Sequence, residues 1–435
     1  MCINTARGGK NMEKYRVAEV FRPNTMPSYT YINRQEKRGT TYETKLKRAL
    51  QKVGSLIAIS GGSKTGKTVL YRKVVPEDKL IELSGAHISS VEDFWQQIAE
   101  NLRIPDELSM AYSSQENKSG KVAASGKTSI WAMITATLSG EFSKGTNQGE
   151  TITKKIMRNN TLVLKALIAG DFVLVIDDFH YINLETQLYL SRILKAELFN
   201  GLKVIILTLP HRADDAIKRN PDLIGRTVFI NLLPWTKEEL EQIARKGFEL
   251  LQVPIPDEQI AHIVRESALS PQLMQENCYN LAIRIKEDHE EISLDAVHRA
   301  FGDTVEAYQH YKENVQRMCE GPAKGRSRRK EYPLKNGQRC DTYGLFLLSL
   351  SIDPPMMKLT SSEIHERMTE ILADGEAAPT GMNLANVVKH SENIIKASVP
   401  ALDTLEWQNS TLYILDPFLL FYLRWDEEWK QDAIR

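Results

Sequence analysis

The stretch GGSKTGKT at residues 61–68 combines glycines, a lysine and a threonine in the spacing G-x-x-x-x-G-K-[ST]. Glycines let a backbone turn tightly, so successive N–H groups can point at phosphate oxygens while the following helix adds its positive end. In such a loop Lys67 would neutralise the β- and γ-phosphates, and the Thr68 hydroxyl would ligate Mg²⁺. We therefore expect a triphosphate-binding loop made by Gly61, Gly62, Ser63, Lys64, Thr65, Gly66, Lys67 and Thr68.

Two adjacent carboxylates, Asp177 and Asp178, follow the apolar run FVLVI at residues 172–176. A carboxylate at the carboxyl end of a buried parallel strand lies where α/β sheets bind ligands. We expect Asp177 to hold Mg²⁺ through its water shell, and Asp178 to orient or deprotonate the attacking water. For Asp178, helix capping or loop solvation is the structural alternative.

The sequence favours ATP as the nucleotide, with Mg²⁺ as its companion ion. It contains no Asn-Lys-x-Asp guanine motif, which disfavours GTPases, and no Leu-Ser-Gly-Gly-Gln signature, which disfavours ABC ATPases. One further expected strand, residues 79–83, lies between the two motifs. That order is typical of P-loop ATPases with an acidic residue beside the metal-binding aspartate. We expect hydrolysis of ATP to ADP and phosphate, and we expect it to be slow.

The elements around these motifs alternate between short apolar runs and helical periods up to residue 233. Continuous apolar strands that alternate with helices imply a parallel sheet covered on both faces. We therefore predict an α/β fold, a P-loop NTPase parallel sheet with helices on both faces, followed by an all-α lid and a C-terminal winged-helix domain. The expected strands are 55–60, 79–83, 172–176, 203–209 and 226–232; the expected helices are 42–53, 69–74, 91–102, 161–169, 185–199 and 211–219.

Five segments are predicted along the chain. They are an N-terminal lead-in (1–40), an ATPase core (41–233) with a Gly/Ser/Thr/Lys-rich insertion (103–160), a helical lid (234–318), a basic linker (319–340) and a winged-helix domain (341–435). Helical periods in the lid cover 236–251, 257–268, 271–286 and 294–315. The last segment is expected to hold helices at 342–351, 361–372 and 382–397, a hairpin over 401–415 that turns at Asn409-Ser410, and a closing helix from Pro417.

Composition limits the possible partners and compartments. Lys+Arg and Asp+Glu number 56 each over 435 residues, so a DNA contact would have to be local. The four cysteines lack metal-ligand spacing, which argues against a zinc site and a disulfide scaffold and fits a reducing compartment. The longest apolar runs are far shorter than the roughly twenty residues of a membrane span, and residues 1–14 are polar. We expect a cytoplasmic protein without membrane contact.

Residues 42–308 resemble the AAA+ and STAND group of P-loop ATPases, most closely its stand-alone bacterial ATP-binding proteins. On this resemblance Thr208, at the end of VIILT, matches a polar residue that senses the γ-phosphate. In that group an arginine shortly afterwards, or one that enters the fifth strand, often reaches the γ-phosphate. Arg212 and Arg226 are the candidates, and arginine suits the task through its permanent charge and forked donors. An ordinary surface salt bridge is the alternative for each.

Two further stretches resemble parts of the same group. LPWTKEEL at 233–240 resembles the entry to its helical lid, and SPQL at 270–273 resembles its Gly-x-Pro sensor turn, whose proline packs near the adenine. On this resemblance Pro271 would lie near the base. The family usually places a glycine where this sequence has Leu269 and Ser270, and Pro271 could instead simply start a helix.

LDPFLLFYLRW at 415–425 resembles the end of the winged-helix domain in archaeal-type ATPases of this group, whose origin-recognition relatives use such a domain on DNA. The helix that would enter the major groove, 382–397, has as basic residues only Lys389, His390 and Lys396, beside Glu392, and its base-reading set is partial: Asn383, Asn386 and Asn393. A protein-contact or autoinhibitory role of this domain is the alternative to DNA binding. The basic residues of 324–330 could contact a phosphate backbone or be a solvated linker.

Three functions remain open from the sequence. The first is an ATP-driven switch of the AAA+/STAND type, homo-oligomeric, that controls a protein partner or separate effector chain, in signalling or antiviral defence. The second is an ATP-gated DNA-binding loader or regulator that uses the winged helix. The third is a nucleotide-binding scaffold with negligible turnover. Salt-dependent DNA affinity and phosphate release would discriminate among them.

Overall fold

The computed structural model describes residues 15–37, 39–102, 160–209, 225–322, 329–398 and 404–434. The chain divides into two compact units. The core unit consists of Asn33–Gly62 and Gly66–Leu233, and the helical unit consists of Met1–Ile32, Ser63–Thr65 and Pro234–Arg435. Among the helices in the described residues, none is long and apolar enough to cross a membrane.

The core unit is built on a five-stranded parallel sheet in the order β2-β3-β4-β1-β5. All five expected strands are confirmed, each within about one residue of its predicted limits. Because the strands are parallel and in register, their carboxyl ends meet at one edge, where Ser60 pairs with Thr208 and Ser84 with Asp177. The strands are β1 (Leu56–Ser60), β2 (Leu80–Ser84), β3 (Val173–Asp177), β4 (Lys203–Thr208) and β5 (Thr227–Asn231).

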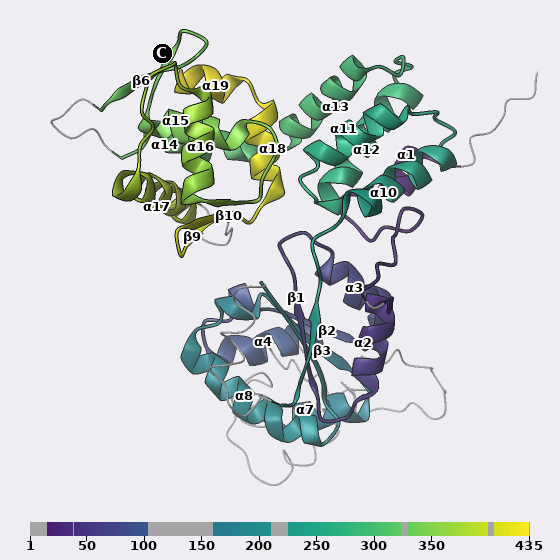
Figure 1. Cartoon of the computed structure of the whole chain (residues 1–435). Helices are drawn as coiled ribbons and strands as arrows, with labels where there is room; N and C mark the ends of the chain where they lie inside the picture. The colour runs from purple at the N-terminus through teal and green to yellow at the C-terminus, as the bar shows by residue number, and fades with distance from the viewer. Residues whose placement is uncertain are drawn as a thin grey trace, which may run out of the picture. The chain divides into compact units, whose positions relative to one another are not determined.

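Helices cover both faces of this sheet, as predicted (Figure 1). Successive side chains of a strand point to opposite faces, so β1 sends Leu56 and Ala58 into one apolar cluster and Ile57 and Ile59 into the other. Helices α2 and α3 pack on the second cluster, and α4, α7 and α8 pack on the first. The bounds are α2 (Tyr42–Gln51), α3 (Lys67–Val74), α4 (Val91–Asn101), α7 (Asn160–Ala169) and α8 (Leu184–Phe199).

The first part of the helical unit is the group of helices expected for the lid. Each of α10, α12 and α13 begins after a Ser or Thr whose hydroxyl accepts a backbone N–H, which satisfies one of the free donors of the first turn. The short helix α1 packs here too, and Phe21 fills the space over Gly247, where a Cβ would lie 2.2 Å from its ring. The bounds are α1 (Val17–Val20), α10 (Lys237–Leu250), α11 (Asp257–Glu266), α12 (Pro271–Lys286) and α13 (Leu294–Ala307).

The single helix predicted over 294–315 is wrong. Helix α13 ends at Ala307, a 3₁₀ turn follows, and α14 (Lys312–Glu320) begins separately. Tyr308 stacks on Phe418 with ring centroids 4.1 Å apart, and the Tyr311 hydroxyl donates to Asp416 over 2.5 Å. These contacts with a distant part of the chain require the backbone to turn where the local pattern would continue the helix.

The segment predicted as a basic linker, 319–340, also contains ordered structure. Strands β6 (Glu331–Pro333) and β7 (Arg339–Asp341) form an antiparallel pair. Tyr332 and Cys340 are buried, which anchors this hairpin on the winged-helix part. Residues 323–328, with most of the basic side chains singled out in the sequence, lie outside the described residues.

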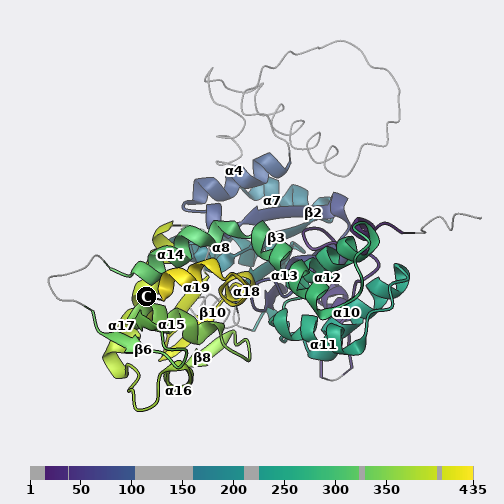
Figure 2. The same cartoon turned by 90° about the horizontal axis from the view of Figure 1, so that it is seen from above.

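The remaining elements include the helices and the hairpin that the sequence predicts for residues 341–435. Strands β9 and β10 are joined at Asn409 and Ser410, both with positive φ, and β10 also pairs with β8, a strand too short to show a period in the sequence. Helix α16 contacts β8, α17 contacts β9, and α15 packs on both helices (Figure 2). The bounds are α15 (Thr342–Ser351), β8 (Lys358–Thr360), α16 (Ser361–Ile371), α17 (Gly381–Ser398), β9 (Leu405–Gln408), β10 (Thr411–Ile414), α18 (Pro417–Trp425) and α19 (Glu428–Ala433).

Within the helical unit, α11 and α18 are joined through the buried carboxylate of Glu266. It accepts hydrogen bonds from Arg424 Nε (2.9 Å) and Nη2 (3.0 Å), Trp425 Nε1 (2.9 Å) and Arg265 Nε (3.1 Å). Burial alone would raise the pKa of Glu266, but the donors of Arg424 and Trp425 hold that pKa below its usual value. The lid helices and the winged-helix part therefore pack as one body.

Candidate nucleotide-binding site

The loop of residues 61–68 joins the carboxyl end of β1 to α3. The Gly61 N–H donates to the Thr208 carbonyl over 3.3 Å, which fixes the start of the loop on β4. Gly66 caps α3 in the left-handed region (φ 96°, ψ 21°), where a residue with a Cβ would be strained. The loop therefore ends at a helix N-terminus whose first N–H groups have no partner within the helix.

The central residues Ser63–Thr65 group with the helical unit. Lys64 Nζ donates to both carboxylate oxygens of Asp416, over 2.9 and 3.1 Å. The indole Nε1 of Trp235 donates to the Thr65 carbonyl over 2.9 Å. The side chain of Lys64 is thus bound by a carboxylate of this chain.

Lys67 lies in the first turn of α3, and its ammonium is held over the loop. Nζ donates to the carbonyls of Gly61 and Gly62, each over 2.9 Å. Burial lowers the pKa of Lys67, and the charges of Asp177 and Asp178 act against that shift. A cation desolvated in this way is poised for stronger anionic partners than two carbonyl oxygens.

The acidic pair occupies the end of β3. Burial raises the pKa of Asp177, while the Asp178 N–H bonded to its Oδ1 (2.8 Å) and the charge of Lys67 lower that pKa. Asp178 follows in the left-handed region (φ 51°, ψ 38°), between β3 and a 3₁₀ turn. A partly buried carboxylate with a second acid beside it favours a bound cation, so this pair fits Mg²⁺.

Thr208 contributes a buried hydroxyl at the same edge of the sheet. It is the last residue of β4, it pairs with Ser60, and its side chain is 1% exposed. Among the described residues its Oγ1 has no hydrogen-bond partner. Because a buried hydroxyl without a partner is costly, its place beside the loop fits a ligand oxygen or a water.

Lys67, Asp177, Asp178 and Thr208 thus come together in the core unit, whereas Arg226 of the same unit does not join them. Arg226 is exposed at the amino end of β5, where its carbonyl accepts from Leu56 N (3.0 Å). The loop follows the opposite end of β1, roughly 15 Å away along the strands. Pro271 is the first residue of α12 in the helical unit, the helix-starting position. Arg212 and most of the 103–160 insertion lie outside the described residues.

Two residues near the acidic pair were missed by sequence reasoning. Glu82 in β2 accepts from the Tyr71 hydroxyl (2.6 Å) and from Arg72 Nε (2.8 Å), so it ties α3 to the sheet. Gly85 follows β2, and a Cβ there would lie 2.4 Å from the Asp178 carbonyl oxygen. The signals were weak: one glutamate inside the apolar run LIELS, and a glycine directly after it.

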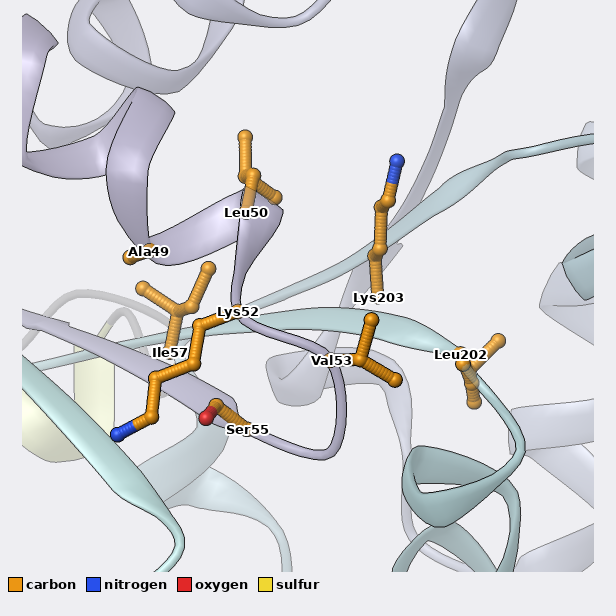
Figure 3. A pocket seen from close by; sticks show the side chains of 9 residues that line it. Ala49, Leu50, Lys52, Val53, Ser55, Ile57, Leu202 and Lys203 are labelled. Atoms are coloured by element: carbon orange, nitrogen blue, oxygen red, sulfur yellow. The ribbon is translucent and has the colours of Figure 1, made fainter.

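A small pocket lies at the opposite edge of the sheet (Figure 3). Its lining includes Val53, which is 74% exposed, Ser55 just before β1, and Lys203 at the start of β4. Lys203 Nζ is already paired with Asp171 over 2.5 Å. This pocket contains none of the residues expected to bind nucleotide, so it is separate from the candidate site.

No protein-family model matches the chain, and no curated protein matches it in sequence. Among solved structures, it is similar to Cdc6p of Pyrobaculum aerophilum, at 14% identity over 96% of this chain and 98% of that one, with a TM-score of 0.42. A Walker-type ATPase of Pyrococcus abyssi aligns at 14% identity over 90% and 96%, with a TM-score of 0.46. The ORC2 protein of Aeropyrum pernix aligns at 15% identity over 95% and 98%, with a TM-score of 0.44.

Proposed function

We propose that this chain is a Mg²⁺-dependent ATPase that works as a slow nucleotide-controlled switch. One observation carries the proposal: a desolvated lysine, a buried carboxylate and a buried hydroxyl without a partner among the described residues meet at the carboxyl edge of one parallel sheet. These groups are Lys67, Asp177 and Thr208. That edge is where α/β sheets bind ligands, and a glycine-capped helix begins beside it.

Each residue has a separate task in this proposal. Lys67 exchanges the carbonyls of Gly61 and Gly62 for phosphate oxygens, and Thr68 and Asp177 hold Mg²⁺, which offsets the triphosphate charge. Asp178 orients the attacking water and accepts its proton. The Thr208 hydroxyl donates to the γ-phosphate or to that water.

An arginine would complete the site from another copy of the chain. Because Arg226 lies at the far end of β5 from the loop of its own chain, we infer that it acts on the γ-phosphate of a neighbouring copy in a homo-oligomer. Arg212 is the other candidate for this task. The forked, permanently charged guanidinium suits the charge that develops on the transferred phosphoryl group.

The proposal is tested by titrating the purified chain with ATP, with Mg²⁺ or with EDTA. We expect saturable binding that is tighter with Mg²⁺, and slow release of phosphate. Tight binding without release would favour a scaffold with negligible turnover. A folded chain without affinity for any nucleotide would contradict the proposal.

The finer assignment is a switch of the AAA+/STAND type that controls a protein partner, in signalling or antiviral defence. It is supported by the resemblance of residues 42–308 to that group. The hydrogen bonds between Glu266 of α11 and Arg424 of α18 support a coupling of the nucleotide state to the partner. Because these bonds join the lid helices to the winged-helix part, a movement of the lid would move that part with it. Ordering by a γ-phosphate is one way such switches run.

A second candidate, duplex DNA binding, is favoured by the exposed face of α17. Asn383, Asn386, Lys389, Asn393 and Lys396 are all exposed and fall at helical spacing, whereas Leu384, Val388 and Ile395 are buried. Lys396, however, is paired with Glu392 over 2.5 Å. The helix therefore offers a narrow polar stripe with little free positive charge.

If the chain binds duplex DNA, affinity measured with ATP present should fall steeply as salt rises. Lys389→Ala should then weaken binding to all sequences and reduce the salt slope by about one unit. Absence of duplex binding at low salt would remove this candidate and leave the protein-controlling switch.

A further inference from the structure

Among the strands of the described residues, β2 is the outermost strand of the core sheet on its side, with β3 as its neighbour. An edge strand leaves a row of backbone N–H and C=O groups without strand partners, and proteins usually cover such an edge. On β2 these outward groups belong to Glu82 and Ser84.

Two side-chain amides of α4 cover this edge. Gln97 Oε1 accepts from Ser84 N (2.7 Å) and its Nε2 donates to Ser84 O (3.1 Å). Asn101 Oδ1 accepts from Glu82 N (3.3 Å) and its Nδ2 donates to Glu82 O (2.7 Å). Each carboxamide thus supplies the donor and the acceptor that a peptide group of a sixth strand would supply.

We call the side chains of Gln97 and Asn101, bonded to the backbone of Ser84 and Glu82, the amide ladder. Its spacing follows from helix and strand geometry. Residues four apart on a helix share a face and rise about 6 Å, and residues two apart on a strand share an edge and rise about 6.6 Å. The two repeats nearly match, so one helix face can satisfy two successive outward peptides.

The end of β2 then touches the acidic pair directly. Ser84 pairs with Asp177 in the sheet register. At the next residue, Gly85, a Cβ would lie 2.4 Å from the Asp178 carbonyl oxygen and 2.8 Å from that of Asp177. Because real Cβ atoms do not approach backbone so closely, the two segments are in contact with no room for a side chain.

Helix α4 is itself firmly placed, because the apolar side chains on the face beside Gln97 and Asn101 are buried in the core. Phe94, Trp95 and Ile98 are at most 1% exposed. The left-handed backbone of Asp178 needs such support, since non-glycine residues keep this conformation where their surroundings enforce it. The ladder therefore fixes β2 relative to α4, and the end of β2 in turn limits where the backbone carbonyls of the two aspartates can lie.

We propose that Gln97 and Asn101 are positioning residues of the ATPase site. By fixing the edge of β2 they hold Gly85 against the backbone carbonyls of Asp177 and Asp178, which sets where the two carboxylates would meet Mg²⁺ and the attacking water. This inference rests on the proposed function and adds to it residues that make no contact with nucleotide.

The test compares Gln97→Ala with Gln96→Ala in the full chain. Gln96 is the matched control, because among the described residues its exposed amide bonds along α4, to Glu100 over 3.0 Å. We expect Gln97→Ala to lower kcat roughly tenfold, as a small misplacement of catalytic groups does. It should also reduce the gain in ATP affinity that Mg²⁺ brings, while affinity in EDTA stays within about twofold. Gln96→Ala should match the wild type in all three readouts.

Gln97→Glu and Asn101→Asp keep the size and the acceptor but lose the donor, so they serve if the alanine variant does not fold. Each should lower kcat below that of the wild type and leave affinity in EDTA unchanged. If folded ladder variants keep the wild-type kcat and Mg²⁺ gain, or lose affinity equally with Mg²⁺ and with EDTA, the positioning role is overturned. A wild-type chain that binds no nucleotide would instead end the proposed function, and this inference with it.

Discussion

Lys67→Ala is expected to weaken ATP binding about a hundredfold or more, because the desolvated ammonium makes charge-assisted hydrogen bonds worth roughly 1.5–3 kcal/mol each. In the structure this ammonium donates to the carbonyls of Gly61 and Gly62. Phosphate oxygens are stronger hydrogen-bond acceptors than these carbonyls, so Lys67→Ala destabilises the ATP complex more than it destabilises the free chain. Calorimetric titration with ATP and Mg²⁺ measures this difference directly.

The matched control is Lys73→Ala, which removes the same charge from an exposed position on the same helix. Its ATP affinity should stay within about twofold of the wild type, since an exposed charge interacts weakly through solvent. Melting curves add a second readout, because a ligand that binds the folded state raises the midpoint. ATP should raise the midpoint of the wild type and of Lys73→Ala but not of Lys67→Ala. Equal affinity in Lys67→Ala and wild type would remove the loop from the site.

The sheet and the loop could be predicted because their signals are local. A glycine-rich motif after a short apolar run indicates the turn between β1 and α3, and continuous apolar runs mark strands that are buried on both faces. The prediction for β3 ended one residue early, at Ile176. Asp177 belongs to the strand because it pairs with Ser84 of β2, and no local pattern could show that pairing.

The missed features depend on partners far along the chain. Helix 294–315 breaks where Tyr311 reaches Asp416, 105 residues away. Gln97 looks like any polar residue on an amphipathic helix until β2 is known to be an edge strand. Gly85 gains its meaning only from the backbone of Asp178. In each case tertiary contacts decide a role that residue type and spacing leave open.

The position of Arg226 illustrates a different limit. The sequence placed it at the entry to the fifth strand, and the structure confirms that placement. A parallel register then sets this entry at the edge of the sheet opposite the loop. Sequence can thus nominate a residue for a site, while strand direction decides whether the same copy of the chain can use it.

Asp178→Asn is expected to keep ATP binding and to slow hydrolysis about a hundredfold or more, which is the usual range for loss of a general base. Asparagine has nearly the same shape and tolerates the left-handed backbone at φ 51°. The substitution therefore removes the charge and basicity of the carboxylate while it preserves the turn into the next segment. Phosphate release at saturating ATP, measured beside ATP affinity, separates the two effects.

The chain contains its own control for this experiment. Asp171 also has positive φ (54°), but it precedes β3 at the end of the strand away from the loop, where it pairs with Lys203. Asp171→Asn makes the same chemical change on the same kind of backbone, so its turnover should stay within about twofold of the wild type, as expected for an exposed ion pair. If Asp178→Asn turned over as fast as Asp171→Asn, the role of Asp178 would be to form the turn after β3. Slow turnover in Asp178→Asn alone would instead assign the chemistry to the carboxylate that Gly85 and the edge of β2 hold in place.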